Sequence, residues 1–220
     1  MNIVDLDNPL DTSRAMRLRA TTRGVHDALD ERITAGAPFV SRERYSLFVM
    51  VQFQFHQDID ALFRKPTLDK LLPDLKVRRR LHLIERDLED LGIVPAVVGS
   101  TLDFGDDGNI DVPTALGWLY VAEGSNLGAA FLLKEAVKLG LSESFGARHL
   151  AAAPLGRGLS WKTFVAALDA AELAQSEEER VIAGACAAFA RVHDLADAFL
   201  KLTTSDVVVI GSENRVEQTS

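Results

Sequence analysis

The chain has 220 residues and a mass of 24.0 kDa, enough for one domain, or at most two, with a sizeable core. Its 32 acidic and 24 basic side chains give a net charge of −8, which argues against a partner such as nucleic acid or an anionic membrane surface. One cysteine cannot form an internal disulfide, and no apolar run reaches the roughly 20 residues that span a bilayer, so we expect a cytoplasmic protein.

Hydrophobic periodicity predicts an all-α single domain, because apolar residues recur at helical spacing and signals for strands are almost absent. In the first expected helix, Leu18, Val25, Leu29 and Ile33 lie on one face. The expected helices cover approximately residues 13–35, 42–62, 75–91, 113–139, 161–173 and 177–202.

Capping residues and helix breakers mark the ends of several of these helices. Thr12 or Ser13 can cap the first helix and Ser41 the second, while Gly36 and Gly140 end helices. A loop rich in Gly and Asp is expected between the third and fourth helices. We therefore expect the whole chain to consist of a flexible leader (1–13), a helical domain (14–202) and a frayed C-terminal tail (203–220).

The segment Gly-Trp-Leu-Tyr-Val-Ala-Glu-Gly-Ser-Asn-Leu-Gly, from Gly117 to Gly128, places three glycines in one helix. Each costs roughly 1 kcal/mol relative to alanine, which indicates a purpose. At about 100° per residue, Gly117, Gly124 and Gly128 fall within about 40° of one another, so one helix face lacks side chains. Spacing alone leaves two interpretations open: close packing of two helices, or a flat ligand lying on bare backbone beside Ser125 and Asn126.

Other polar residues also allow two interpretations. His26 lies next to an apolar face, where a histidine is more often a core residue, although a neutral imidazole in an apolar pocket suits an axial haem ligand. Gln52 and His56 either hydrogen-bond locally, with His56 exposed as a further option, or belong to a polar network that holds water. Arg78–Arg80 is expected on a solvated helix face. No His, Cys or Glu spacing predicts a zinc or di-iron site.

Several segments between Arg14 and Leu200 carry a resemblance to a known family. They are Leu18–Asp27, Pro38–Ser41, Gly117–Leu132, Phe145–Leu150, and Gly156-Arg157-Gly158 with Trp161. The chain resembles the bacterial haem oxygenases, which degrade haem to biliverdin, and especially the iron-acquisition type of Gram-negative bacteria. The run Glu-Gly-Ser-Asn-Leu-Gly-Ala-Ala-Phe-Leu is highly specific for this family.

The resemblance implies that haem, both substrate and cofactor, lies between a proximal and a distal helix. It implies that His26 is the proximal iron ligand and that the distal helix approaches the porphyrin at Gly124 and Gly128, with Gly124 and Ser125 bordering bound dioxygen. Ordered water would replace a distal acid. The residues implied to hold this water are Gln52, His56, Arg80, Asn126 and Trp161.

The resemblance also indicates how haem is rotated in the pocket. Arg19 and Tyr120 match positions that contact the haem propionates. A related branch that yields β and δ biliverdin has asparagine and phenylalanine at these positions. That branch has lysines where this chain has Thr34 and Glu135. We therefore expect cleavage mainly at the α-meso carbon.

The implied reaction converts haem through an iron-hydroperoxide to biliverdin, carbon monoxide and ferrous iron in a monomeric enzyme. No nicotinamide or flavin motif is recognisable, so an external reductase or ferredoxin would supply the electrons for O2. One alternative is a non-enzymatic haem carrier or sensor, which needs no distal polar set and commonly has a second axial ligand. Another is a helical enzyme that acts on a small metabolite without haem, for which carboxylate or cysteine catalysts are expected.

Overall fold

The computed structural model describes residues 13–95, 104 and 110–202. These residues form seven α-helices and three short 3₁₀ helices without a β-strand, so the predicted all-α class is confirmed. The α-helices are α1 (Arg14–Ala35), α2 (Arg42–Ile59), α3 (Pro66–Leu71), α4 (Leu81–Asp90), α5 (Val112–Lys138), α6 (Arg157–Ala170) and α7 (Gln175–Leu200). The 3₁₀ helices are η1 (Asp60–Arg64), η2 (Leu75–Arg78) and η3 (Arg148–Leu150).

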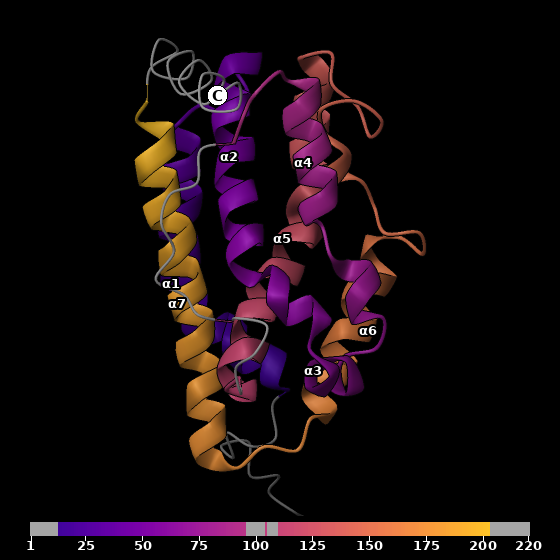
Figure 1. The fold of residues 1–220 in the computed structure, drawn as a ribbon. Helices are drawn as coiled ribbons and strands as arrows, with labels where there is room; N and C mark the ends of the chain where they lie inside the picture. Colours follow the sequence, from indigo (N-terminus) through magenta and orange to yellow (C-terminus); the bar gives the residue numbers. More distant parts are fainter. Residues whose placement is uncertain (1–12, 96–103, 105–109, 203–220) are drawn as a thin grey trace, which may run out of the picture.

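Four long helices form the body of the molecule, with α7 packed along α5, α1 and α2. Figure 1 shows α1 and α7 side by side on one flank, α2 and α5 in the middle, and α4 and α6 on the other flank. The central turns of α2, from Tyr45 to Phe55, are buried except at the half-buried Gln52. The core therefore runs along α2, and Gln52 is the one residue of this stretch that is only half-buried.

The expected caps are present. Ser13 Oγ accepts a hydrogen bond from the backbone of Met16 at 3.1 Å, and Ser41 Oγ accepts one from the backbone of Arg44 at 3.2 Å. Gly140 follows α5 with a φ of +76°, a conformation that glycine adopts without steric cost. These helix ends were predictable because each depends on a residue and its immediate neighbours.

The expected third helix, over residues 75–91, is wrong in its first part. α4 begins only at Leu81, because Asp74 has a left-handed conformation (φ +60°) and Arg79 is extended, so the preceding residues form only η2. The short helix α3 begins at Pro66, where only a connection was expected. α6 begins at Arg157, four residues before the expected start.

Parts of the expected organisation lie outside the described residues. These parts are residues 1–12 of the leader, the tail at 203–220 and most of the loop at 92–109.

One glycine of the Gly117–Gly128 segment serves helix packing. A Cβ on Gly117 would lie 2.2 Å from the carbonyl oxygen of Val181 in α7, and a Cβ on Gly184 would lie 2.4 Å from that of Thr114 in α5. Real Cβ atoms do not approach this closely, so the two glycines let α5 and α7 touch through their backbones. The close-packing interpretation is therefore correct for Gly117.

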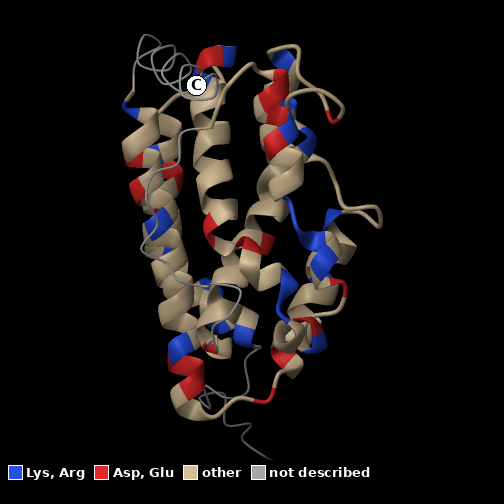
Figure 2. Ribbon diagram, in the orientation of Figure 1, with Lys and Arg blue, Asp and Glu red and all other residues tan. Residues whose placement is uncertain are grey.

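Charged residues are spread over the helices. Figure 2 shows Lys and Arg interspersed with Asp and Glu on most of them. Among the described residues, no helix combines the length and the apolar character needed to cross a membrane.

Candidate active site

A cavity of about 1010 Å³ separates α1 from α5 and is closed on its inner sides by α2, η3, α6 and α7. Its volume is at the upper end of the range, about 300–1,000 Å³, that is usual for pockets binding small organic ligands. Apolar walls come from Phe48, Phe55, Leu150, Phe189 and Val192. A large, mainly planar and apolar ligand therefore suits this space.

His26 projects from α1 into the cavity with its side chain 54% exposed in the protein alone. It is not a core residue, and its surroundings are less apolar than expected. Its Nδ1 lies 3.2 Å from a carboxylate oxygen of Asp30 and 3.9 Å from one of Asp27, and its ring meets the edge of Phe189. A carboxylate beside Nδ1 leaves Nε2 free to bind a metal and fixes the ring orientation.

The opposite wall of the cavity is the bare stretch of α5. A Cβ on Gly124 would come no closer than 4.0 Å to Trp161, and a Cβ on Gly128 would meet nothing within 4 Å. Both glycines line the cavity, so the flat-ligand interpretation applies to them. Ser125 lies between them and donates its hydroxyl hydrogen to the carbonyl of Ala122 at 2.7 Å, within the helix.

The polar residues expected to hold water all face this one cavity. They are Gln52, His56, Arg80, Asn126 and Trp161. His56 is only 4% exposed, and its Nδ1 has no hydrogen-bond partner among the described residues. Neither local interpretation holds, because His56 is neither exposed nor bonded to Gln52. Burial, with the nearby charges of His149 and Arg80, lowers the pKa of His56 to about 3, so its imidazole is neutral at physiological pH.

Two residues at or beside the cavity were missed from the sequence. His149 of η3 also lines the cavity, and its Nδ1 lies 2.7 Å from Oδ2 of the fully buried Asp87 in α4. Its Nε2 is buried and has no partner within the described part of the chain. Burial raises the pKa of Asp87, but hydrogen bonds and charge from His149 outweigh this effect and bring the pKa below its ordinary value. The only available signal was the position of His149 in the Phe145–Leu150 segment.

The run Arg78–Arg80 does not form a solvated helix face. The three side chains diverge, because the backbone leaves η2 before α4 begins. Arg78 forms an ion pair of 2.7 Å with the buried Glu123 of α5, and Arg79 pairs with Asp60. Arg80 donates to the carbonyl oxygens of two residues around η3, at 2.9 and 3.2 Å, and burial lowers its pKa.

Arg19 and Tyr120 lie at the same cavity, from α1 and α5. Burial raises the pKa of the Tyr120 hydroxyl, while the positive charge of Arg19 acts in the opposite direction, which indicates that the two are close. Thr34 also lines the cavity, whereas Glu135 is held by Lys138 at 2.6 Å and is not one of the described lining residues. A cation and a hydroxyl can thus bind an anionic ligand group together.

These residues fit an iron porphyrin. One wall offers an imidazole nitrogen free to bind iron, the opposite wall exposes bare backbone at Gly124 and Gly128, and the two walls are separated by an apolar space. No group of three or more His, Cys, Asp or Glu side chains that could hold a separate metal ion occurs among the described residues. The site is suited to bind haem iron from one side and leave a small polar space on the other.

Sequence comparison points to the same ligand. Residues 12–198 match the haem oxygenase family. The chain is 43% identical over 183 residues to the haem oxygenase PigA of Pseudomonas aeruginosa, a match that covers 83% of this chain and 90% of that protein.

Structural comparison agrees. The fold is similar to that of the NO- and CO-bound haem oxygenase from Neisseria meningitidis, with a TM-score of 0.79 and 40% identity over 87% of this chain and 94% of the other. The haem oxygenase of Leptospira interrogans, at 16% identity and a TM-score of 0.65 over 87% of this chain and 100% of the other, shares the fold.

Proposed function

The chain belongs to the haem oxygenase family, and from that premise we propose that it cleaves haem oxidatively to biliverdin, carbon monoxide and ferrous iron. The observation that carries this function is the cavity between His26 of α1 and the bare backbone at Gly124 and Gly128 of α5. That arrangement provides one iron ligand and keeps the opposite face accessible to a diatomic molecule. The enzyme uses O2 and electrons from an external reductase or ferredoxin.

His26 would hold the haem iron through Nε2, with Asp30 orienting the ring through Nδ1. Bound haem would supply both the iron that activates O2 and the meso carbon that is oxidised. Gly124 and Gly128 would let the helix backbone approach the porphyrin closely, and Gly124 with Ser125 would border the space for O2. A helix backbone close to the porphyrin would favour reaction at the edge of the ring.

The polar set Gln52, His56, Arg80, Asn126 and Trp161 would hold ordered water on the distal side. His56 supports this role, because its buried and neutral imidazole has an Nδ1 without a partner in the described chain. Such an atom is costly to bury unless water satisfies it. The ordered water would then deliver protons to the reaction.

Arg19 and Tyr120 would bind the haem propionates and thereby fix the rotation of the ring. Glu135 would not compete as a propionate ligand, since its carboxylate is negative and already paired with Lys138. We therefore infer the α isomer of biliverdin as the main product, and chromatography of the products tests this. A mixture dominated by the β and δ isomers would contradict the propionate assignment but not the reaction.

The organisation proposed for the whole chain is a haem oxygenase domain over residues 14–202, working as a cytoplasmic monomer in iron acquisition. The extent of the family match, residues 12–198, supports these limits. Gel filtration with light scattering tests the oligomeric state.

Absorption spectra of the haem-loaded protein in air test the function. With ascorbate or a reductase, the Soret band of haem should disappear while the broad red band of biliverdin grows. A haem carrier or sensor would keep its Soret band, and a metabolite enzyme would bind no haem. Either result would contradict the proposed function.

A further inference from the structure

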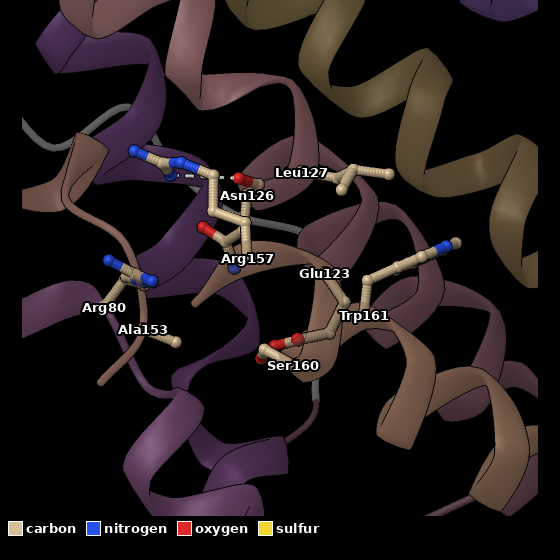
Figure 3. A pocket seen from close by; sticks show the side chains of 8 residues that line it. All are labelled: Arg80, Glu123, Asn126, Leu127, Ala153, Arg157, Ser160 and Trp161. Carbon is tan, nitrogen blue, oxygen red and sulfur yellow. Dashed lines mark hydrogen bonds between the residues drawn. The ribbon is translucent and has the colours of Figure 1, made fainter. Parts of the chain in front are cut away.

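A second pocket, of about 10 Å³, is lined mainly by residues of α5 and α6 (Figure 3). Four residues line both spaces: Arg80, Asn126, Leu127 and Trp161. The small pocket therefore adjoins the cavity at the residues proposed to hold distal water. Its volume is about that of one water position.

Glu123 of α5 lines this pocket and directly precedes Gly124. Figure 3 shows its carboxylate reaching toward Ser160 of α6. The residue is only 4% exposed, and its Oε2 accepts a hydrogen bond from Arg78 Nη1 at 2.7 Å. Its Oε1 is buried without a hydrogen-bond partner in the described residues, an arrangement that costs roughly 1–3 kcal/mol unless water supplies the donor.

The charged groups around Glu123 come from three elements. Arg78 of η2 forms the ion pair, Arg80 lies immediately before α4, and Arg157 of α6 lines the same pocket. The adjoining cavity adds two titratable side chains, His56 of α2 and His149 of η3. Burial raises the pKa of Glu123 above its ordinary value, although the charges of Arg78 and Arg80 oppose this. Its carboxyl group thus keeps a proton to higher pH than an exposed glutamate does.

We propose that the small pocket binds one water molecule on Glu123 Oε1, and that Glu123 supplies protons through this water to the haem cavity. The proposal rests on the proposed function, because reduction of O2 during haem cleavage consumes protons. It also places a carboxylic acid behind the distal water, where no acid was expected from the sequence.

The proton transfer balances within the site. The O–H bond of the Glu123 carboxyl breaks as the pocket water accepts the proton, and that water releases one of its own protons to water beside Asn126. The remaining carboxylate is stabilised by its ion pair with Arg78 and regains a proton from solvent. Glu123 is therefore a positioning residue that acts through water and does not touch the reacting atoms.

Glu123→Gln tests the proposal, because glutamine keeps the shape and one acceptor oxygen but carries no titrating proton. For the wild type we expect the rate of biliverdin formation to fall as pH rises through the pKa of Glu123. For the variant we expect a rate at most about tenfold lower than that of the wild type on the acidic side of this pKa. The rate of the variant should not show this dependence on pH. In the haem-free wild type, ¹³C NMR should show the Glu123 carboxyl titrating above the ordinary value of about 4.3, and a crystal structure should show the pocket water.

Asp58→Asn is the matched control. Asp58 is also a buried carboxylate in an ion pair, with Arg191 at 2.7 Å, but it is not one of the described residues that line either pocket. Its variant should keep the wild-type rate and pH profile. The proposal is overturned if Glu123→Gln keeps them too, or if the haem-free wild type has no pocket water and an ordinary Glu123 titration.

Failure of the proposed function would look different. A wild-type protein that does not cleave haem would contradict that function, whereas the water and the carboxyl titration are measured without haem. These two measurements also decide the pocket proposal if Glu123→Gln does not fold.

Discussion

Asp87 Oδ2 accepts two hydrogen bonds from His149, one from its backbone N–H at 2.9 Å and one from Nδ1 at 2.7 Å. The carboxylate is fully buried in α4, and its other oxygen binds Arg148. In a neutral imidazole, this double contact keeps the proton on Nδ1. In that tautomer Nε2 is an acceptor among the residues that line the haem cavity.

Asp87→Asn should remove this control. An amide cannot accept from Nδ1–H and the backbone as strongly as a carboxylate does, and we expect a loss of about 1.5–3 kcal/mol in the free energy of unfolding. In ¹⁵N NMR spectra of the haem-free protein, the neutral form of His149 should change from a single Nδ1–H tautomer to a mixture. An unchanged tautomer in the variant would show that Asp87 does not determine it.

His56 should make the stability of the haem-free protein depend on pH. Its folded-state pKa, about 3, lies below the unfolded value of about 6.5, so the unfolded chain binds the extra proton first. The free energy of unfolding should therefore fall as pH drops from about 6.5 toward 3. Urea titrations of the wild type and His56→Gln would measure this, with a smaller decrease expected in the variant. Equal decreases would exclude His56 as the cause.

Two alanine substitutions in α5 should have opposite effects. Gly117→Ala would force a methyl group into the backbone of α7 and should lower the free energy of unfolding by about 1–3 kcal/mol. Gly124→Ala meets nothing closer than 4.0 Å, so it should fold as well as the wild type or better. Because its methyl group enters the haem cavity, it should slow haem cleavage. Thermal unfolding and turnover distinguish the two variants. Equal destabilisation would contradict the assignment of Gly117 to helix packing and of Gly124 to the haem cavity.

The sequence predicted what depends on neighbours along the chain. The caps Ser13 and Ser41 were identified because an N-cap contacts the residue three positions later. By contrast, the periodicity of α5 places Gly117 and Gly124 on one face and does not reveal that α7 covers only the first of them. The division of the three glycines between helix packing and the cavity therefore needed the tertiary structure.

Long-range polar pairs were not predictable. Arg78 and Glu123 are 45 positions apart and Asp87 and His149 are 62 apart, and neither pair produces a local pattern. The roles of His26 and of the polar distal set came from the family resemblance, and the structure adds that these residues share one cavity. The contact between His26 and Asp30 was not predictable either. An Asp one turn after a histidine is common on exposed helices, so the sequence does not single it out.

His26→Ala should leave a folded protein, because the side chain is half-exposed and packs mainly against Phe189. The apolar walls should still take up haem, but the absorption spectrum should lose the features of histidine ligation and turnover should collapse. Added imidazole should restore part of both. If the His26→Ala variant had the spectra and turnover of the wild type without added imidazole, His26 would not be the iron ligand.

Simultaneous measurement of carbon monoxide and biliverdin tests the central claim most directly. Haem-loaded wild-type protein, supplied with O2 and a reductase or ascorbate, should release carbon monoxide and biliverdin in equimolar amounts as haem is consumed, and His26→Ala should release neither at a comparable rate. Loss of haem without carbon monoxide, or with peroxide alone as the product, would contradict enzymatic cleavage of haem by this protein.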